Sequence, residues 1–555
     1  MRKPVFILVS SALLGLLLAC NGTGTDSSGG NDASVTVQAA FQKEVLNSAG
    51  GHTMTTLPAR YCYVEFHDNA SNAVTGSGGF LDGSGQGTFQ VPSGESVYAV
   101  VYAAWQIPGS SSASYFMQGE VVNATFGTPY NSTSDWYATS STFTAGAGTL
   151  NVLALDDSSR IAGAFNVADQ GVTFALGMQG LAPATPLPNL AIYWTTSTNP
   201  SNQYRVYPQV ALDSSNNLIL QNGHALFQAA VFGNASGAAN AEQDEWDDGT
   251  LGETYAHLLF APYTFKADGS NSLSYLRADT ENVPFISLGV PAEPSQAFIS
   301  GFSDFLSAAF RNNPQILDSY GNGTSTPSVQ NEDLSQSSSL GEFSRYGVAG
   351  SLWSMWKQAL GGGQSGLQTL WNATLTSNSG LDFVGDYNGS PLGCFPTYLV
   401  GLRAAAGGSW PGCQTAFSAW GVADPSNTYF STGSALWTNE ATPFSVTGAT
   451  LVSPATPAAS SLSYDRNGAA LYRFVQGSTG TPQIQMAPTG GQDFELDLLG
   501  PNGPIAYNYA SPFAATRTIN TQTLAPGSYV IRVRVNPDNN LVRTGNSYSY
   551  NLSLN

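Results

Sequence analysis

The chain has 555 residues, of which 37 are acidic and 18 are lysine or arginine, so its formal net charge at pH 7 is -19. Because few basic side chains are available to neutralise phosphates, this charge argues against a nucleic-acid partner and against attraction to anionic lipid. The length allows two to four domains. The composition, poor in charge and rich in glycine, serine, threonine and asparagine, is that of an exported bacterial protein.

Residues 1–19 have the features of an export signal. Arg2 and Lys3 precede an apolar run from Val5 to Cys20, which is too short to span a bilayer comfortably. The run ends in "LLAC", which resembles the lipobox of bacterial lipoproteins. This resemblance implies cleavage before Cys20 and lipidation of its thiol. The alternative is a soluble secreted protein that is cut nearby, in which Cys20 has no role.

Residues 20–33 are rich in glycine, serine and asparagine, a composition that predicts a flexible tether. Asn21 directly follows Cys20, at the position where an aspartate favours retention in the inner membrane of some diderm bacteria. We therefore expect a lipid-anchored protein of the cell envelope, located at the outer membrane or the cell surface.

Residues 34–156 consist of short alternating segments that are separated by glycine, serine and asparagine turns. Segments such as "ARYCYVEFHD", "SVYAVVYAAW" and "TLNVLAL" are typical of strands, and no stretch has a helical period. The pattern predicts an all-β domain of the sandwich type. Cys62 lies in one of these strands, and we expect its thiol to be buried and inert.

Residues 157–440 change character, because longer segments lose the period of two after Ser158. Apolar residues recur at helical spacing in Ser295–Arg311, where Phe298, Phe302 and Phe305 form a stripe. The domain predicted here is α+β and mainly α. Its other expected helices are Thr250–Phe260, Phe343–Leu360, Gly366–Leu375 and Leu392–Ala406.

Cys394 and Cys413 are separated by a loop that contains glycine and proline. Because an exported protein meets oxidising conditions, we predict a disulfide between them. Closing a loop of this length would stabilise the fold by about 3 kcal/mol.

Residues 441–461 are rich in proline, threonine, serine and alanine, which predicts a linker. The segment 462–555 then returns to regularly spaced strands, among which "SYVIRVRV" has the clearest alternation. Its motifs "LYRFVQG", "FELDLLGPNG" and "LAPGSYVIRVRV" resemble the bacterial pre-peptidase C-terminal domain. The resemblance implies a small β-sandwich that serves in adhesion, targeting or maturation and is not itself catalytic.

The central segment resembles exported bacterial proteins related to the H-E-x-x-H zinc metallopeptidases, which are gluzincin-like. The motifs that carry the resemblance are "AGAFNV", "LPNLAIYW", "DEWDD", "GETYAHLL", "QAFISGF" and "GEFSRYGVAGSLWSMW", in that order. The fold class that these patterns imply is multidomain, with a metallopeptidase-like domain between two β-sandwiches.

The chain departs from this family at the residues that carry the chemistry. Glu253 stands where the family has its first zinc histidine, and Thr254 stands where it has the catalytic glutamate. His257 matches the second histidine, whereas Ser300 replaces the third ligand. Zinc hydrolysis needs three protein ligands and a carboxylate base, so the motif is degenerate. Asp304 could supply a ligand, although it lies about 6 Å further along the helix.

A metal-free interpretation of the same stretch is a helix start. Thr250 and Glu253 fit the Thr-x-x-Glu capping box, in which the two side chains satisfy free backbone amides. The acidic turn before it suits the positive end of the helix dipole. We therefore expect no catalytic residues and no bound cofactor, with a zinc site at Glu253 and His257 as the alternative.

Calcium is a second alternative cofactor, because it takes oxygen ligands and two acidic groups are present. Solvated acidic surfaces are the ordinary interpretation of both groups. They are Glu242, Asp244, Glu245, Asp247 and Asp248 before the helix, and Asp493, Glu495 and Asp497 on one strand face near the C-terminus.

The sequence therefore predicts a lipid-anchored envelope protein with an inactive metallopeptidase-like domain and a role in surface adhesion or binding. The expected partners are the membrane, through the lipid, and a protein or polysaccharide ligand. The alternative is an active zinc-dependent hydrolase that uses Glu253 and His257 with a third ligand.

Overall fold

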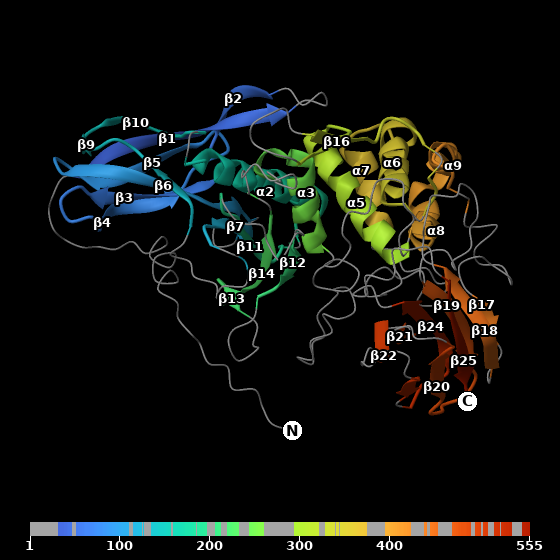
Figure 1. Cartoon of the computed structure of the whole chain (residues 1–555). Helices are drawn as coiled ribbons and strands as arrows, with labels where there is room; N and C mark the ends of the chain where they lie inside the picture. The colour runs from blue at the N-terminus through green and yellow to red at the C-terminus, as the bar shows by residue number, and fades with distance from the viewer. Residues whose placement is uncertain are drawn as a thin grey trace. The chain divides into compact units, whose positions relative to one another are not determined.

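The computed structural model shows a multidomain chain of mixed helices and strands (Figure 1). Cys20, the tether up to residue 31 and Cys394 lie outside the described residues. Two compact units are present: Met1–Leu258 with Leu317–Asn331, and Leu259–Ile316 with Glu332–Asn555. The structure describes residues 32–555 except for a few single residues or pairs and the segments 47–51, 110–114, 127–134, 197–205, 212–218, 234–243, 260–293, 321–327, 375–394, 425–437, 441–443, 453–468, 490–493, 509–515 and 536–546.

The first unit contains a four-stranded sheet that is built around β1. Strand β1 pairs in parallel with β10 and in antiparallel fashion with β2 and β5. The alternating pattern buries Val35, Val37 and Phe41 on one face of β1. The strands are β1 (Asp32–Leu46), β2 (His52–Pro58), β5 (Gln86–Pro92) and β10 (Gly148–Ala154).

A ten-stranded sheet is the larger sheet of this unit. Its main path is β12-β14-β11-β7-β6-β3-β4, with β13 beside β14 and with β8 and β9 beside β6. Because β11 pairs in parallel with β7, this sheet continues across the boundary expected at residue 156. The strands are β3 (Cys62–Asp68), β4 (Val74–Phe80), β6 (Ser96–Pro108), β7 (Tyr115–Val122), β8 (Tyr137–Thr139), β9 (Phe143–Thr144), β11 (Asn189–Tyr193), β12 (Val206–Val210), β13 (Leu220–Gln221) and β14 (His224–Ala230).

Helix α2 (Ile161–Leu181) supplies the crossover between β7 and β11 and packs against β6 and β7. Gly171 allows its close approach, because a Cβ there would lie 2.6 Å from atoms of both Trp105 and Tyr255. The Tyr255 hydroxyl, on α3 (Asp248–Ala256), donates a hydrogen bond of 2.9 Å to the Val167 carbonyl. Helix α3 is thereby fixed on α2.

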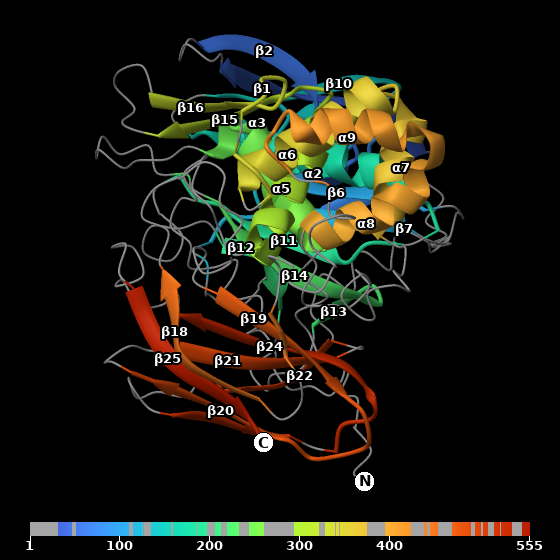
Figure 2. The ribbon, with the colours of Figure 1, turned by 90° about the vertical axis from the view of Figure 1, so that its right-hand side faces the viewer.

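The helices of the second unit pack in pairs, with α5 on α6 and α7 on α8 (Figure 2). The stripe predicted on α5 is confirmed, because Phe298, Phe302 and Phe305 are all buried. Among the described residues, no helix is long and apolar enough to cross a membrane. The helices are α5 (Pro294–Arg311), α6 (Arg345–Ser354) with a π-helical turn (Met355–Ala359), α7 (Gln364–Thr374), α8 (Phe395–Ala406) and α9 (Trp410–Ser418).

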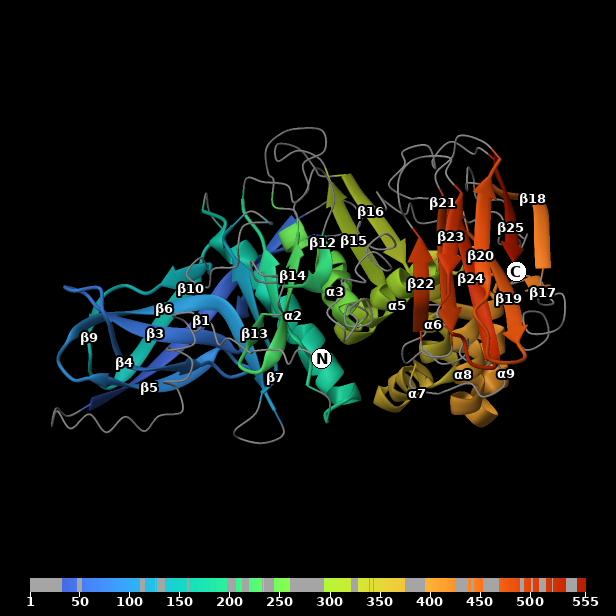
Figure 3. The same ribbon diagram turned by 90° about the horizontal axis from the view of Figure 1, so that it is seen from below.

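Two sheets form the C-terminal sandwich, with strand orders β17-β19-β24-β21-β22 and β18-β25-β20-β23 (Figure 3). Strand β18 pairs with β25, so the linker predicted for 441–461 contains a strand of this sandwich. The strands are β17 (Thr438–Glu440), β18 (Phe444–Val452), β19 (Ala469–Gln476), β20 (Gln483–Pro488), β21 (Phe494–Gly500), β22 (Gly503–Asn508), β23 (Arg517–Asn520), β24 (Gly527–Val535) and β25 (Ser547–Leu554). Strands β15 (Gln315–Tyr320) and β16 (Ser328–Asp333) form a separate two-stranded sheet.

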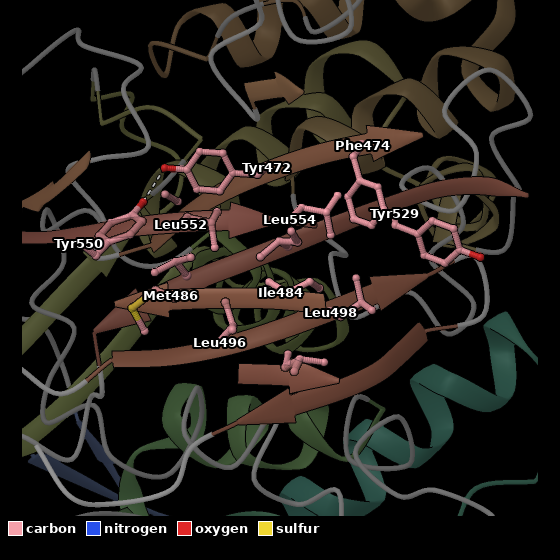
Figure 4. Close-up of a cluster of buried hydrophobic side chains, with 14 of the residues drawn as sticks. Tyr472, Phe474, Ile484, Met486, Leu496, Leu498, Tyr529, Tyr550, Leu552 and Leu554 are labelled. Carbon is pink, nitrogen blue, oxygen red and sulfur yellow. Dashed lines mark hydrogen bonds between the residues drawn. The ribbon is translucent and has the colours of Figure 1, made fainter. Parts of the chain in front are cut away.

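The core of this sandwich is a cluster of aliphatic and aromatic side chains from both sheets (Figure 4). Ile484 and Met486 of β20 and Leu496 and Leu498 of β21 are completely buried within it. One polar contact lies in the cluster, where the hydroxyls of Tyr472 and Tyr550 are 2.6 Å apart. One phenol donates to the other, so a single hydrogen bond joins the two sheets inside the buried cluster.

The solvated acidic face predicted near the C-terminus is wrong for Asp497. Its side chain is fully buried, as is that of Arg532 on the neighbouring strand, and the Arg532 Nε lies 2.8 Å from the Asp497 Oδ2. The two residues are direct partners in the register of β21 and β24, so each charge is neutralised by the other. Asp493 and the side chain of Glu495 lie outside the described residues.

Candidate functional site at helix α3

Helix α3 begins two residues earlier than expected and is almost entirely buried. A 3₁₀ turn at Asp244–Trp246 leads into it, and a second turn at His257–Leu259 follows it. The first turn is joined to the helix by backbone hydrogen bonds, from Asp247 N–H to the Asp244 carbonyl and from Leu251 N–H to the Asp247 carbonyl. Hydrogen bonding in the helix therefore starts at Asp247.

The capping box predicted for Thr250 and Glu253 is wrong. The N-cap residue is Asp247, and its side chain makes no capping hydrogen bond. Thr250 lies in the first turn of the helix, and its hydroxyl contacts the Leu317 carbonyl at 3.4 Å. Because the acidic turn runs directly into the helix, the cap falls three residues before the Thr-x-x-Glu pattern. Glu253 therefore has no capping role.

Glu253 and His257 lie on one face of α3, as their spacing predicted. The Glu253 Oε1 is 3.5 Å from the His257 Nε2, and both side chains are buried. This separation suits an ion pair with a protonated imidazole, and two ligand atoms of one metal ion would also lie this close. A catalytic zinc centre needs a third protein ligand in addition.

The described residues do not complete a zinc site at this pair. They contain no group of three histidine, cysteine or acidic ligand atoms that includes Glu253 and His257. Ser300 and Asp304 are on α5, which belongs to the second unit. Arg345 engages Asp304 through both its Nε and its Nη2, the latter at 2.7 Å from the Asp304 Oδ1. Asp304 is therefore neutralised by a guanidinium.

Thr254, which the sequence resemblance predicts in place of a catalytic glutamate, is fully buried. Its hydroxyl donates a hydrogen bond of 3.0 Å to the Thr250 carbonyl, one turn back in the same helix. A hydroxyl in this arrangement has no accessible negative form at neutral pH, so it does not take a proton from water.

A group of three carboxylates is present beside α3, formed by Asp244, Asp247 and Asp318. One oxygen of each lies within 4.8 Å of the others, and Asp244 and Asp247 are completely buried whereas Asp318 is partly exposed. All the ligand atoms are carboxylate oxygens, the type that calcium and magnesium prefer. The sequence singled out Asp244 and Asp247 but missed Asp318, which β15 brings to them from a distant part of the chain.

The remaining acidic residues at this place are paired with basic side chains. Glu245 is paired with Arg160, and Asp248 accepts from Lys43 Nζ at 2.5 Å. Burial lowers the pKa of Arg160 to about 10. The acidic stretch is therefore divided between ion pairs and the three-carboxylate group, and is not a single solvated turn. Glu242 lies outside the described residues.

The described cysteines are buried thiols. The predicted burial of the Cys62 thiol on β3 is confirmed, and burial, reinforced by the charge of Asp169, raises its pKa. Its inertness stays a prediction. Burial likewise raises the pKa of Cys413 on α9 to about 11. Cys413 is a free thiol in the structure and Cys394 lies outside the described residues, so their disulfide stays a prediction.

Comparison with known families and curated proteins finds no match. Among solved structures, the pre-peptidase C-terminal domain of a collagenase from Bacillus anthracis covers 21% of this chain and 92% of its own, at 15% identity and a TM-score of 0.15. PliG, a periplasmic inhibitor of g-type lysozyme from Aeromonas hydrophila, covers 21% of this chain and 93% of its own, at 12% identity and a TM-score of 0.14.

A cycloisomaltooligosaccharide glucanotransferase from a Paenibacillus species covers 93% of this chain and 72% of its own, at 8% identity and a TM-score of 0.13. Of these three comparisons, the one with the collagenase domain gives a weak, partial structural likeness to a pre-peptidase C-terminal domain. They carry no argument about what the chain does.

Proposed function

We propose that this chain is an exported, lipid-anchored binding protein of the cell envelope, in which the metallopeptidase-like segment does not hydrolyse peptides. The observation that carries this proposal is the state of Thr254. Its hydroxyl is buried and bonded to the Thr250 carbonyl, at the position where hydrolysis needs a base. A metal-bound water at α3 would have no neighbouring group in this position to accept its proton.

The architecture supports a binding role in a second way. The C-terminal sandwich has an apolar core to which both of its sheets contribute (Figure 4). Its motifs resemble pre-peptidase C-terminal domains, which accompany secreted proteins and serve in adhesion or targeting. A chain that combines a binding module of this type with a segment that lacks a general base for hydrolysis is suited to attachment and not to proteolysis.

The decisive measurement is the metal content of the purified full chain together with a peptidase assay. We expect less than stoichiometric zinc and no cleavage of casein or a peptide library, while the protein supports attachment of cells to a surface. His257→Ala should leave the zinc content unchanged.

One result would replace this proposal by the alternative, an active hydrolase with a modified metal site. In that result, the unchanged protein contains stoichiometric zinc and hydrolyses peptides. His257→Ala or Glu253→Ala loses both the zinc and the hydrolysis. The 3.5 Å separation of Glu253 and His257 is what makes this alternative worth testing.

A further inference from the structure

A row of aromatic side chains crosses one face of the ten-stranded sheet. Its members are Phe80 on β4, Tyr63 on β3, Tyr102 on β6 and Tyr137 on β8, which we call the aromatic ladder. Tyr63 is the register partner of Phe80, and Tyr102 is the partner of Tyr137, so each strand contributes one ring. The centroids of successive rings are 5.2, 6.1 and 5.9 Å apart.

The ladder lies on the face of the sheet that the core does not use. On the opposite face of β3, Val64 and Phe66 are fully buried, and Phe66 packs edge-on against Phe89 of β5. Tyr137 is 51% exposed, and the other rings of the ladder are partly exposed. A contiguous row of rings that are all at least partly exposed is characteristic of a binding surface.

Hydrogen-bonding groups lie directly beside the rings. The Tyr102 hydroxyl donates to Glu65, and the His67 Nε2 is 2.8 Å from the Glu65 Oε1, so this buried carboxylate is already engaged. The donated proton leaves the Tyr102 oxygen with acceptor capacity towards a ligand.

Asp135 provides a second and independent sign of a ligand. It lies two residues before Tyr137 on the same face, and its side chain is 9% exposed. Its Oδ1 accepts no hydrogen bond from any residue that the structure describes. Because buried polar atoms are nearly always satisfied, this oxygen requires a donor from outside the described part of the chain.

We propose that the aromatic ladder, with Asp135 beside it, binds a neutral glycan chain. Partly exposed rings in a row pack against the C–H faces of successive sugar units, and sugar hydroxyls donate to the Asp135 and Tyr102 oxygens. The carboxylates of Glu65 and Glu120 near the rings disfavour a sulfated or uronic acid chain. The inference rests on the binding function proposed above and names its ligand class.

A cationic ligand suits this geometry less well. Recognition of an ammonium group uses rings that surround it, whereas the ladder rings follow one another across four strands. Glu65 is already occupied by Tyr102 and His67. Burial and the nearby charge of Glu120 raise the pKa of Asp135, which weakens its attraction for a cation.

The test is affinity electrophoresis of the full chain through gels that contain hydroxyethylcellulose, soluble starch, dextran or arabinoxylan, with dextran sulfate and polylysine as charged probes. We expect retardation by at least one neutral polysaccharide and by neither charged probe. Tyr137→Ala should lower the association constant at least about tenfold, equivalent to 1.4 kcal/mol. Tyr102→Phe, which keeps the ring, should lower it by less.

The matched control is Met54→Ala, which truncates an exposed apolar side chain on β2, away from the ladder. It should bind like the unchanged protein, and the thermal midpoints of all variants should be compared to establish folding. Unchanged retardation in a folded Tyr137→Ala would overturn the ladder as the site. Retardation by a charged probe in place of the neutral polymers would overturn the ligand class.

The failure of this inference is distinguishable from failure of the proposed function. If the full chain supports cell attachment but no neutral polysaccharide retards it, the glycan inference is wrong and the binding function stands. If the chain also fails to support attachment, the proposed function is wrong as well.

Discussion

Arg532 and Asp497 face each other across β24 and β21, both fully buried, with 2.8 Å between Nε and Oδ2. Removing one charge leaves the other without its counter-ion in a low-dielectric core. We therefore predict that Arg532→Ala lowers the free energy of unfolding of the C-terminal sandwich by about 3–5 kcal/mol. Urea denaturation of the full chain, followed by a probe in this sandwich, measures the change.

Two further variants distinguish lost charge pairing from a general loss of packing. The double variant Arg532→Met with Asp497→Leu removes both charges and should recover most of the stability, because no charge remains unpaired. Val475→Ala, at a side chain 54% exposed on β19, should change the stability by less than about 0.5 kcal/mol. A double variant as unstable as Arg532→Ala would contradict the electrostatic explanation.

Asp135 predicts a pH-dependent stability in the first unit. Burial and the adjacent Glu120 raise its pKa above the unfolded value of about 3.9. The folded state therefore binds the proton more tightly, so the stabilisation is fully present below the unfolded pKa and is lost as the pH rises through the folded pKa. Asp135→Asn should raise the thermal midpoint more at pH 8 than at pH 4. An equal shift at both pH values would show that this carboxyl does not titrate as proposed.

Features set by neighbours in the chain were predictable from the sequence. The helical spacing of Phe298, Phe302 and Phe305 predicted the buried stripe of α5, and the alternation in β24 predicted that Ile531 and Val533 are buried. Both depend on a fixed repeat along a single element, so the residue pattern alone is sufficient.

Features that depend on pairing between distant elements were not predictable. Alternation places Arg532 on the face of β24 opposite to Ile531, but it does not reveal that Asp497 stands across from it and that this face is covered. Asp318 joins Asp244 and Asp247 only because β15 lies beside the acidic turn. The capping pattern at Thr250 was misleading, because the preceding 3₁₀ turn already continues into the helix.

Thr254 gives a prediction in which stability changes and chemistry does not. Thr254→Val keeps the shape of the buried side chain and removes the hydrogen bond to the Thr250 carbonyl. We expect the free energy of unfolding to change by about 1 kcal/mol and peptide cleavage to stay at background. Cleavage that is present in the unchanged protein and lost in Thr254→Val would assign the hydroxyl a chemical role and contradict the proposed function.

The proposed lipidation of Cys20 predicts how the protein partitions between membrane and medium. The proposed thioether-linked diacylglyceryl group would hold the chain on the membrane through its buried methylenes. Cys20→Ser should therefore move the protein to the soluble fraction of the cells that produce it, and metabolic labelling with a fatty acid should be lost. Asn21→Gln keeps the cysteine and should remain on the membrane and labelled. Membrane association that persists in Cys20→Ser would count against the anchor.

The cysteines provide a prediction about thiol reactivity that also tests the expected disulfide. Cys62 and Cys413 are buried, and burial raises the pKa of both thiols, to about 11 for Cys413. Because the thiolate is the reactive form, neither should react with a disulfide reagent at pH 8 in the folded protein. In denaturant without reductant, Cys62 should react, whereas Cys413 should react only after reduction if it is joined to Cys394. Reaction of Cys413 before reduction would show that this disulfide is absent, and Cys394→Ser should then leave the thermal midpoint unchanged.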